Sequence, residues 1–406
     1  MASIDNDCVI SIHKLIDAYT SDPSVIPGFV ANVVNRKGEL LVNYAAGQMG
    51  LDNPAPMTTD SVFWLASCSK LIGAICAMQQ VEKGLIGLDD ADRLEEVIPE
   101  LKDVKVIKLV DRKPTLVPKK NRITLRMLLS HTAGFSYSFF HPWLIKLFPH
   151  VDELAGDKHV LDTPLVFEPG TDWGYGTSMD WVGVLIERLR GKPVSEVVQE
   201  DIFAPLGITD IEMRPTQSMR ERLANLHQKD PEGNLTQREH VYSLDAEFES
   251  FGAGYFAKGS EYTKLLAMLL NNGVGNGNRV LSQKSVDDMF VNQIPQWPNY
   301  GRRATPPGKP EYTNALPELY PQGNAPQGWG ISFMLTIEPT DTGRGPNTAW
   351  WSGIINTFWW VDREKGVAGL CQSQILPFGD EDVMVLWNTI EAMVYKSLVQ
   401  EKKGKL

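Results

Sequence analysis

The sequence of 406 residues is poor in cysteine and has no apolar run long enough to cross a bilayer. Its four cysteines, Cys8, Cys68, Cys76 and Cys371, match neither the ligand spacing of a metal site nor a disulfide framework. The first residues are polar and acidic, so we expect no secretory signal peptide and no membrane association. Buried thiols in a reducing, cytoplasmic environment are the expectation that follows.

Positive charge is also scarce, because 39 lysines and arginines stand against 50 aspartates and glutamates. The net charge of −11 argues against nucleic acid as the main partner. The G-x-S-x-G elbow of α/β-hydrolases and the H-E-x-x-H zinc motif are both absent. The glycine-rich segment 273–277 follows no predicted strand, so we expect a loop there and not a phosphate cradle. We therefore predict no metal and no cofactor.

Strand patterns occur near both ends of the chain, and helical patterns fill the middle. The predicted strands are 28–35, 39–44, 329–337, 348–352, 356–361 and 367–374. Helical periodicity is clearest in segments 123–130, 181–189, 262–271 and 381–399. We predict an α/β (α+β) fold in which one antiparallel sheet, built from both chain ends, is flanked by helices and carries an inserted, mainly helical domain.

The domain boundaries follow from the same patterns. Residues 1–84 and 328–406 are predicted to form the sheet domain, and residues 85–327 the mainly helical domain. Segment 295–326 contains eight prolines and almost no periodicity. We expect it to be a long loop that covers part of the molecule.

Ser67 and Lys70 form the most informative pair in the chain. They precede an apolar stretch, 71–81, that has helical spacing and ends before Gly84. Residues three apart share one face of a helix, so the hydroxyl and the amine should lie side by side in its first turn. A desolvated, neutral lysine can take the proton of the serine and make it a nucleophile. The alternative is that Ser67 only caps an exposed helix.

Two further segments carry groups suited to an active site. Tyr175 lies on a loop after the Pro169–Gly170 turn, where its phenol can face a site or anchor an aromatic core. Segment 350–353 (Trp-Trp-Ser-Gly) ends a predicted strand, where Gly353 lets a ligand approach the backbone or marks a bulge.

The order Ser-x-x-Lys, Tyr-Gly-Thr-Ser, Trp-Ser-Gly resembles the serine β-lactamase and penicillin-binding superfamily, and within it the class C-like esterases and acyltransferases. The likeness covers nearly the whole chain and is strongest to the fungal acyltransferases of statin biosynthesis. Other segments that match are 128–134 (Leu-Leu-Ser-His-Thr-Ala-Gly), 136–137, 141–142, 167–170, 205–210 and 252–255.

The resemblance implies a role for each matching residue. Ser67 corresponds to the acylated nucleophile, Lys70 to its base and Tyr175 to a proton relay. The backbone amides of Ser67 and Ile354 correspond to the oxyanion hole. Side chains near these motifs are expected to contact substrate, although the tryptophans can also serve core packing alone. They are Tyr137, Trp173, Trp329, Trp351, Ser352 and Gly353.

Two positions depart from the lactamase pattern. Trp351 replaces the lysine that helps to hold a substrate carboxylate, and Thr177 replaces an asparagine. Without that cation an anionic β-lactam loses a charge-assisted partner, whereas a neutral, apolar acyl ester does not.

The sequence therefore predicts a serine acyltransferase that passes an acyl group from a small-molecule thioester or ester to an alcohol. A carboxylesterase is the alternative with the same site, and a non-catalytic binding protein is the alternative of another class.

Segment 102–122 is basic in an otherwise acidic chain, with eight lysines and arginines. One interpretation is a solvated hairpin. The other is a docking face for an acidic acyl carrier domain or for coenzyme A phosphates, both of which carry negative charge.

Overall fold

The computed structural model describes residues 2–302, 308–314 and 325–400. Its centre is an eight-stranded sheet in the order β14-β15-β16-β17-β18-β2-β3-β4, in which every neighbouring pair is antiparallel. Three strands come from the start of the chain, β2 (Gly28–Asn35), β3 (Leu40–Gly50) and β4 (Asn53–Pro56). Five come from its end, β14 (Gln327–Trp329), β15 (Met334–Thr336), β16 (Thr348–Gly353), β17 (Thr357–Asp362) and β18 (Val367–Gln372). The predicted sheet from both chain ends is confirmed.

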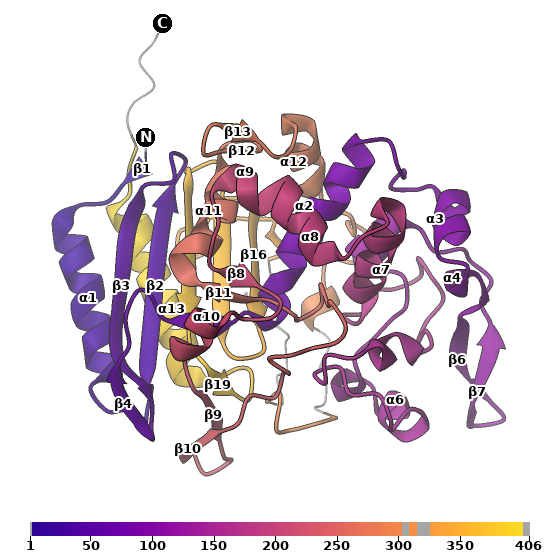
Figure 1. Ribbon diagram of the computed structural model, residues 1–406, viewed down its shortest axis with the longest axis horizontal. Helices are drawn as coiled ribbons and strands as arrows, with labels where there is room; N and C mark the ends of the chain where they lie inside the picture. The colour runs from indigo at the N-terminus through magenta and orange to yellow at the C-terminus, as the bar shows by residue number, and fades with distance from the viewer. Residues whose placement is uncertain (1, 303–307, 315–324, 401–406) are drawn as a thin grey trace, which may run out of the picture.

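Helices cover the sheet (Figure 1). On one side, α1 (Asn6–Thr20) packs on β3 and on α13 (Glu381–Ser397). On the other side, α11 (Gly259–Leu270) packs on β2 and β18. With helices on both faces of the sheet, β16, β17 and β18 consist entirely of buried, mostly apolar residues.

The ends of these helices are set by local chemistry. Asp5 and Asp380 cap α1 and α13, since each carboxylate accepts a hydrogen bond from a backbone amide three residues on. α2 (Ser69–Glu82) follows a 3₁₀ turn, η1 (Ala66–Cys68). Lys83 is its C-cap, and Gly84 comes next, with a φ of 67° that suits glycine. The helix predicted after Ser67 is therefore present.

The middle of the chain contains the predicted helices and also several short strands. The helices there are α3 (Ala91–Val97), α4 (Glu100–Asp103), α5 (Leu125–Leu129), α6 (Pro142–Leu147), α7 (Ser178–Arg190), α8 (Val194–Val198), α9 (Ala204–Leu206), α10 (Gln217–Glu221), α11 and α12 (Gln283–Met289). Two hairpins pair β6 (Lys105–Val110) with β7 (Lys113–Pro118), and β9 (Leu226–Lys229) with β10 (Leu235–Arg238). β11 (Phe256–Lys258) joins β5 (Val62–Trp64) to β8 (Ile211–Glu212).

Short strands and helices alternate in this part of the chain. The mainly helical middle domain, 85–327, and its boundaries therefore stay a prediction. The remaining short strands are β1 (Ala2–Ser3), β12 (Val274–Gly275), β13 (Asn278–Arg279), β19 (Ile375–Leu376) and β20 (Val399–Gln400). Much of the predicted proline-rich covering loop, 295–326, lies outside the described residues; its described part includes the turn η5 (Tyr300–Arg302). No helix in the described ranges combines the length and apolar character needed to cross a membrane.

Candidate active site

Ser67 lies in the tight turn that starts α2. The preceding residue, Ala66, has a φ of +45°, in the left-handed region that residues other than glycine rarely adopt. Ala66 is buried, so surrounding packing holds this strained backbone in place. The turn fixes the position of Ser67 at the helix start, where free amides favour negative charge on a nearby oxygen.

Lys70 lies one turn further along, and its amine is buried beside the serine. Nζ donates hydrogen bonds to Ser67 Oγ at 3.1 Å, Tyr137 OH at 2.9 Å and the Gly252 carbonyl at 2.7 Å. Lys70 is fully buried, and desolvation lowers the pKa of its amine to about 7. A lysine with this pKa is partly neutral near pH 7, as a general base must be.

Asp180, in the first turn of α7, supports Lys70 through Gly252, a role that the sequence does not predict. Its Oδ1 accepts hydrogen bonds from Ser250 Oγ at 2.5 Å and from the Gly252 amide at 3.1 Å. The carbonyl of the same Gly252 accepts from Lys70, and the Asp180 charge raises the pKa of Lys70 against the effect of burial. A Cβ at residue 252 would come within 2.7 Å of Asp180 Oδ2, so glycine is needed there.

The hydroxyl of Tyr175 also lies beside Ser67. It shares a hydrogen bond with Ser67 and accepts one from Trp351 Nε1 at 2.9 Å. Burial raises the pKa of the phenol, and these two hydrogen bonds partly oppose that rise. Tyr175 is therefore protonated near neutral pH and can pass a proton on, while Lys70 is the group poised to accept one. Lys70 Nζ also lies 4.7 Å from the centroid of the Tyr175 ring.

The predicted substrate-binding aromatics come together around Tyr175. Trp329 lies 4.6 Å from Trp351 and 5.2 Å from Trp173, measured between ring centroids, and Tyr137 lies 5.4 Å from Tyr175. The tryptophans are at most 9% exposed, so they also pack the core, as the alternative interpretation expects. Trp351 has a polar role as well, because its N–H fixes the Tyr175 hydroxyl. Tyr137 accepts a hydrogen bond from the amine of Lys70 and thus lies beside it.

Strand β16 brings Ser352, Gly353 and the following Ile354 to the Ser67 turn. A Cβ at residue 353 would come within 2.6 Å of the Leu65 carbonyl, so glycine allows β16 to approach the Ser67 turn. Ser67 and Ile354 line one small cavity together with Tyr137, Phe139 and Leu154. The two residues predicted to supply oxyanion-hole amides therefore face a common space.

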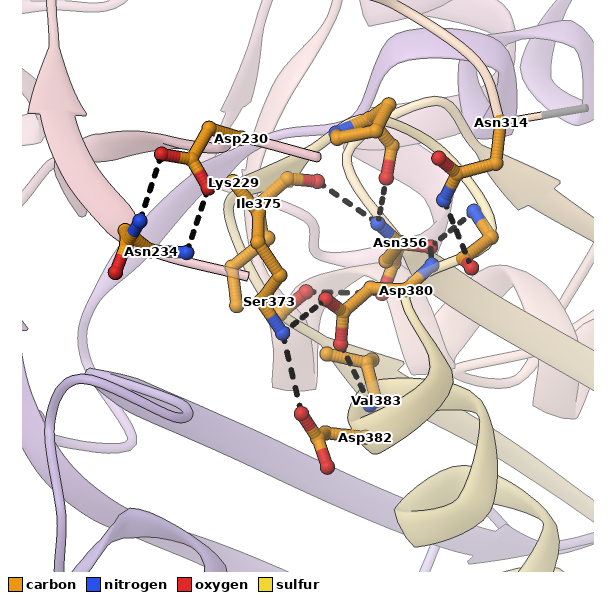
Figure 2. Close-up of polar contacts among 12 residues, drawn as sticks. Lys229, Asp230, Asn234, Asn314, Asn356, Ser373, Ile375, Asp380, Asp382 and Val383 are labelled. Atoms are coloured by element: carbon orange, nitrogen blue, oxygen red, sulfur yellow. Dashed lines mark hydrogen bonds and ion pairs between the residues drawn. The ribbon is translucent and has the colours of Figure 1, made fainter. Parts of the chain in front are cut away.

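Asn356 anchors the turn that carries Ile354 and was also missed in the sequence. Its side-chain amide donates to the carbonyls of Ile375 and Pro377, at 2.8 and 3.0 Å. Its side-chain oxygen accepts from the amides of Gly379 and Asp380, at 2.8 and 3.1 Å. Figure 2 shows these bonds beside the Asp380 carboxylate, which caps α13 and pairs with Lys229. With a φ of +60°, Asn356 suits a left-handed turn, and four hydrogen bonds fix that turn to the 375–380 loop.

Two other side chains near the site, a thiol and an imidazole, are unsuited to catalysis. Cys68 is buried and desolvation raises the pKa of its thiol, so a reactive thiolate is disfavoured. His131 is buried, desolvation lowers the pKa of its imidazole well below the usual range, and its ring nitrogens have no hydrogen-bond partner among the described residues. Its backbone, at a φ of +56°, accepts a hydrogen bond from Gly174 and so supports the Tyr175 loop.

The charge of Asp180 predicts a shift in pH dependence. Because Lys70 must be neutral to act as base, acylation should rise as the pH passes upward through about 7. Asp180→Asn removes the negative charge that favours protonated Lys70, so the pKa of Lys70 should fall and this acid limb should move to lower pH. The measurement is the pH profile of kcat/KM for a small ester. Ser250→Ala is the control, because it keeps the Asp180 charge and should shift the acid limb of the profile less. If Asp180→Asn leaves the acid limb at the same pH, Asp180 does not set the pKa of Lys70.

Comparison with known proteins agrees with this arrangement. The family model described as Beta-lactamase matches residues 16–390. Lovastatin esterase of Penicillium rubens is 32% identical over 92% of this chain and 96% of its own length. Monacolin J acid methylbutanoyltransferase of Aspergillus terreus is 31% identical over 85% of this chain and 84% of its own. The solved structure of simvastatin synthase from Aspergillus terreus superimposes with a TM-score of 0.80 and 27% identity, covering 96% of this chain and 98% of that one.

The predicted resemblance and fold are thereby confirmed, and the relatives are acyltransferases and esterases, the class of enzyme that the sequence predicts. This chain belongs to the Beta-lactamase family, on the branch that contains the fungal esterases and acyltransferases acting on statins.

Proposed function

We propose that this protein is a serine acyltransferase that forms an acyl-enzyme on Ser67 and passes the acyl group to an alcohol of a small molecule. One observation carries the proposal: the buried Lys70 amine lies 3.1 Å from Ser67 Oγ, and the Tyr175 hydroxyl contacts the same oxygen. A base and a proton relay thus flank a single nucleophile.

In the first half-reaction, neutral Lys70 takes the proton of Ser67 while Oγ bonds to the acyl carbon of the donor. The amides of Ser67 and Ile354 hold the oxygen that becomes negative. Collapse breaks the bond from the acyl carbon to the leaving sulfur or oxygen, which receives the proton from Lys70 through Tyr175. In the second half, an alcohol loses its proton along the same route and attacks the acyl carbon, and Ser67 Oγ leaves with that proton.

The substrates we propose are apolar acyl groups and the alcohol of a polycyclic secondary metabolite. Aromatic rings surround Tyr175, and the position of the third-motif lysine is occupied by Trp351, so no cation there selects an anionic donor. One relative is named as an esterase of lovastatin, and another is named for the transfer of a methylbutanoyl group to monacolin J acid.

A carboxylesterase is the second candidate, because the relative at 32% identity is an esterase. The two activities differ only in whether an alcohol or water removes the acyl group. The test is to incubate the enzyme with a methylbutanoyl thioester, with and without monacolin J acid, and to identify products by mass. Ester formation that outpaces release of free acid supports transfer. Free acid alone, at a rate unchanged by the alcohol, would assign the esterase, and no turnover of any ester would favour a binding protein.

Because Trp351 stands at the position of the third-motif lysine, we can predict which substrates the enzyme accepts. Anionic β-lactams should be poor substrates, whereas p-nitrophenyl butyrate should be cleaved, because a β-lactam carboxylate finds no lysine at this position. The measurement compares kcat/KM for the ester with that for a penicillin and a cephalosporin. Cleavage of the β-lactams at a rate that rivals the ester would contradict this assignment.

We also propose that the basic segment 102–122 docks an acidic acyl carrier domain. Several of its cations pair within the chain, Lys108 with Glu168 and Arg122 with Glu95 and Asp92. In the described structure Arg112 and Lys113 make no ion pair, and they sit at the turn of the β6–β7 hairpin beside the exposed Leu109. This hairpin tip is the part of the segment best suited to a partner.

Charge reversal at the hairpin tip tests this docking. Arg112→Glu with Lys113→Glu should raise the apparent KM for a carrier-bound donor severalfold, because steering between opposite charges is lost, and the effect should shrink as salt rises. The KM for an N-acetylcysteamine thioester should not change. Lys37→Glu, an exposed charge on another surface, is the control. An equal rise in KM for both donors, or no rise for either, would show that the hairpin has no role in the choice of donor.

We also propose a cytoplasmic location. All four cysteines are free and buried, as expected for a protein kept in a reducing compartment.

A further inference from the structure

Three side chains from one short segment, 150–162, meet on the surface beyond α6. His150 follows that helix, and His159 and Asp162 belong to the 3₁₀ turn η3 (Lys158–Asp162). Asp162 Oδ2 lies 2.8 Å from His159 Nδ1 and 3.5 Å from His150 Nε2. The three ligand atoms all lie within 4.8 Å of one another. Each of the three side chains is about half exposed, with values of 54%, 53% and 49%.

These separations suit donors around a single ion. Zinc binds histidine nitrogen at about 2.0–2.1 Å and carboxylate oxygen at about 2.0–2.2 Å. Two donors at such distances and at tetrahedral or octahedral angles lie roughly 2.9–3.5 Å apart. The separations of Asp162 Oδ2 from the two imidazoles, 2.8 and 3.5 Å, are close to this range. Two imidazoles and one carboxylate are ligands that borderline ions such as Zn²⁺, Ni²⁺ and Co²⁺ accept, and the exposed side leaves room for water.

We propose that His150, His159 and Asp162 bind one divalent transition-metal ion, and that this ion ties together the two ends of segment 150–162. The proposal is independent of the acyl-transfer chemistry, which uses none of these residues. Without metal, the group amounts to an exposed hydrogen bond and ion pair, which adds little stability. With metal, three ligands from two separate positions of the loop share one centre.

The tied segment reaches the active site. Glu153, within it, accepts hydrogen bonds from the amide and hydroxyl of Ser138, the latter at 2.8 Å. Ser138 follows Tyr137, which contacts Lys70. Glu153 and Leu154 also line the cavity that contains Ser67. An ion at the surface would therefore restrain the wall of this cavity from outside, without taking part in the reaction.

The primary test is direct metal binding to the full chain after treatment with a chelator. Calorimetric titration with ZnCl₂ and with NiCl₂ should show one equivalent bound, and CoCl₂ should produce the visible absorption of a ligated ion. His150→Ala, His159→Ala and Asp162→Asn should each weaken binding at least tenfold. His13→Ala removes a histidine that stacks on Tyr44 elsewhere and should bind like the parent. Because the three ligands are exposed, the variants should fold, which circular dichroism of the metal-free proteins checks.

Hydrogen exchange tests the second half of the proposal. Zn²⁺ should slow amide exchange in segment 150–162 of the parent protein and should leave the Asp162→Asn variant unchanged. Absence of binding by the parent, or equal binding by all ligand variants, would overturn the site. Binding that depends on the three ligands but leaves exchange in 150–162 unaltered would overturn the restraint on the loop.

Discussion

Ser67→Ala should abolish turnover of both esters and thioesters while the protein remains folded. The substitution removes only the oxygen that we propose bonds to the acyl carbon, and no neighbouring group can replace it. In enzymes whose nucleophile and base act as a unit, loss of the nucleophile lowers kcat by a factor on the order of 10⁶. Lys70→Ala should be nearly as severe, because the hydroxyl then lacks the base that lies 3.1 Å away.

Mass spectrometry identifies the nucleophile directly. A slowly deacylated ester should add one acyl group to the intact protein, and the modified peptide should place it on Ser67. Cys68→Ala is the matched control, since it changes the adjacent residue, whose buried thiol has a raised pKa. It should keep both the adduct and the activity. An adduct on Cys68 or Ser69, or full activity of Ser67→Ala, would refute the assignment.

Tyr175→Phe should lower both the acylation and deacylation rates by about 10²–10⁴-fold, the usual contribution of a general acid–base group. The ring would stay in the aromatic cluster while the hydroxyl that contacts Ser67 and Trp351 is lost. Pre-steady-state kinetics with a p-nitrophenyl ester separate the two rates.

Tyr255→Phe is the control for Tyr175, because it deletes a buried hydroxyl that has no hydrogen-bond partner in the described structure. Its rates should stay close to those of the parent. If Tyr175→Phe changes both rates by less than about tenfold, its hydroxyl is not the proton relay and the residue serves packing alone.

Several features missed in the sequence depend on contacts between distant segments. Asp180 is one acidic residue among buried positions of α7, and this pattern is a signal that sequence reasoning can use. Asn356 gives a weaker signal, since it is simply a polar residue between two strands. The short strands β5, β8 and β11 have two or three residues each, too few for alternation to be visible. His159 and Asp162 are three residues apart in one 3₁₀ turn, but only the path of the chain brings His150 to them.

The sequence by itself determined the elements whose causes are local. Helical spacing places Ser67 beside Lys70, periodicity separates strands from helices, and the order of the motifs indicates the family. Tertiary structure alone decided how reactive those groups are. Burial sets the pKa of Lys70 near 7, the Gly252 carbonyl accepts from its amine while Asp180 binds the Gly252 amide, and Trp351 reaches Tyr175 across 176 positions of sequence. The reason is physical: desolvation and long-range hydrogen bonds depend on which surfaces pack together, and no periodic pattern along the chain encodes that.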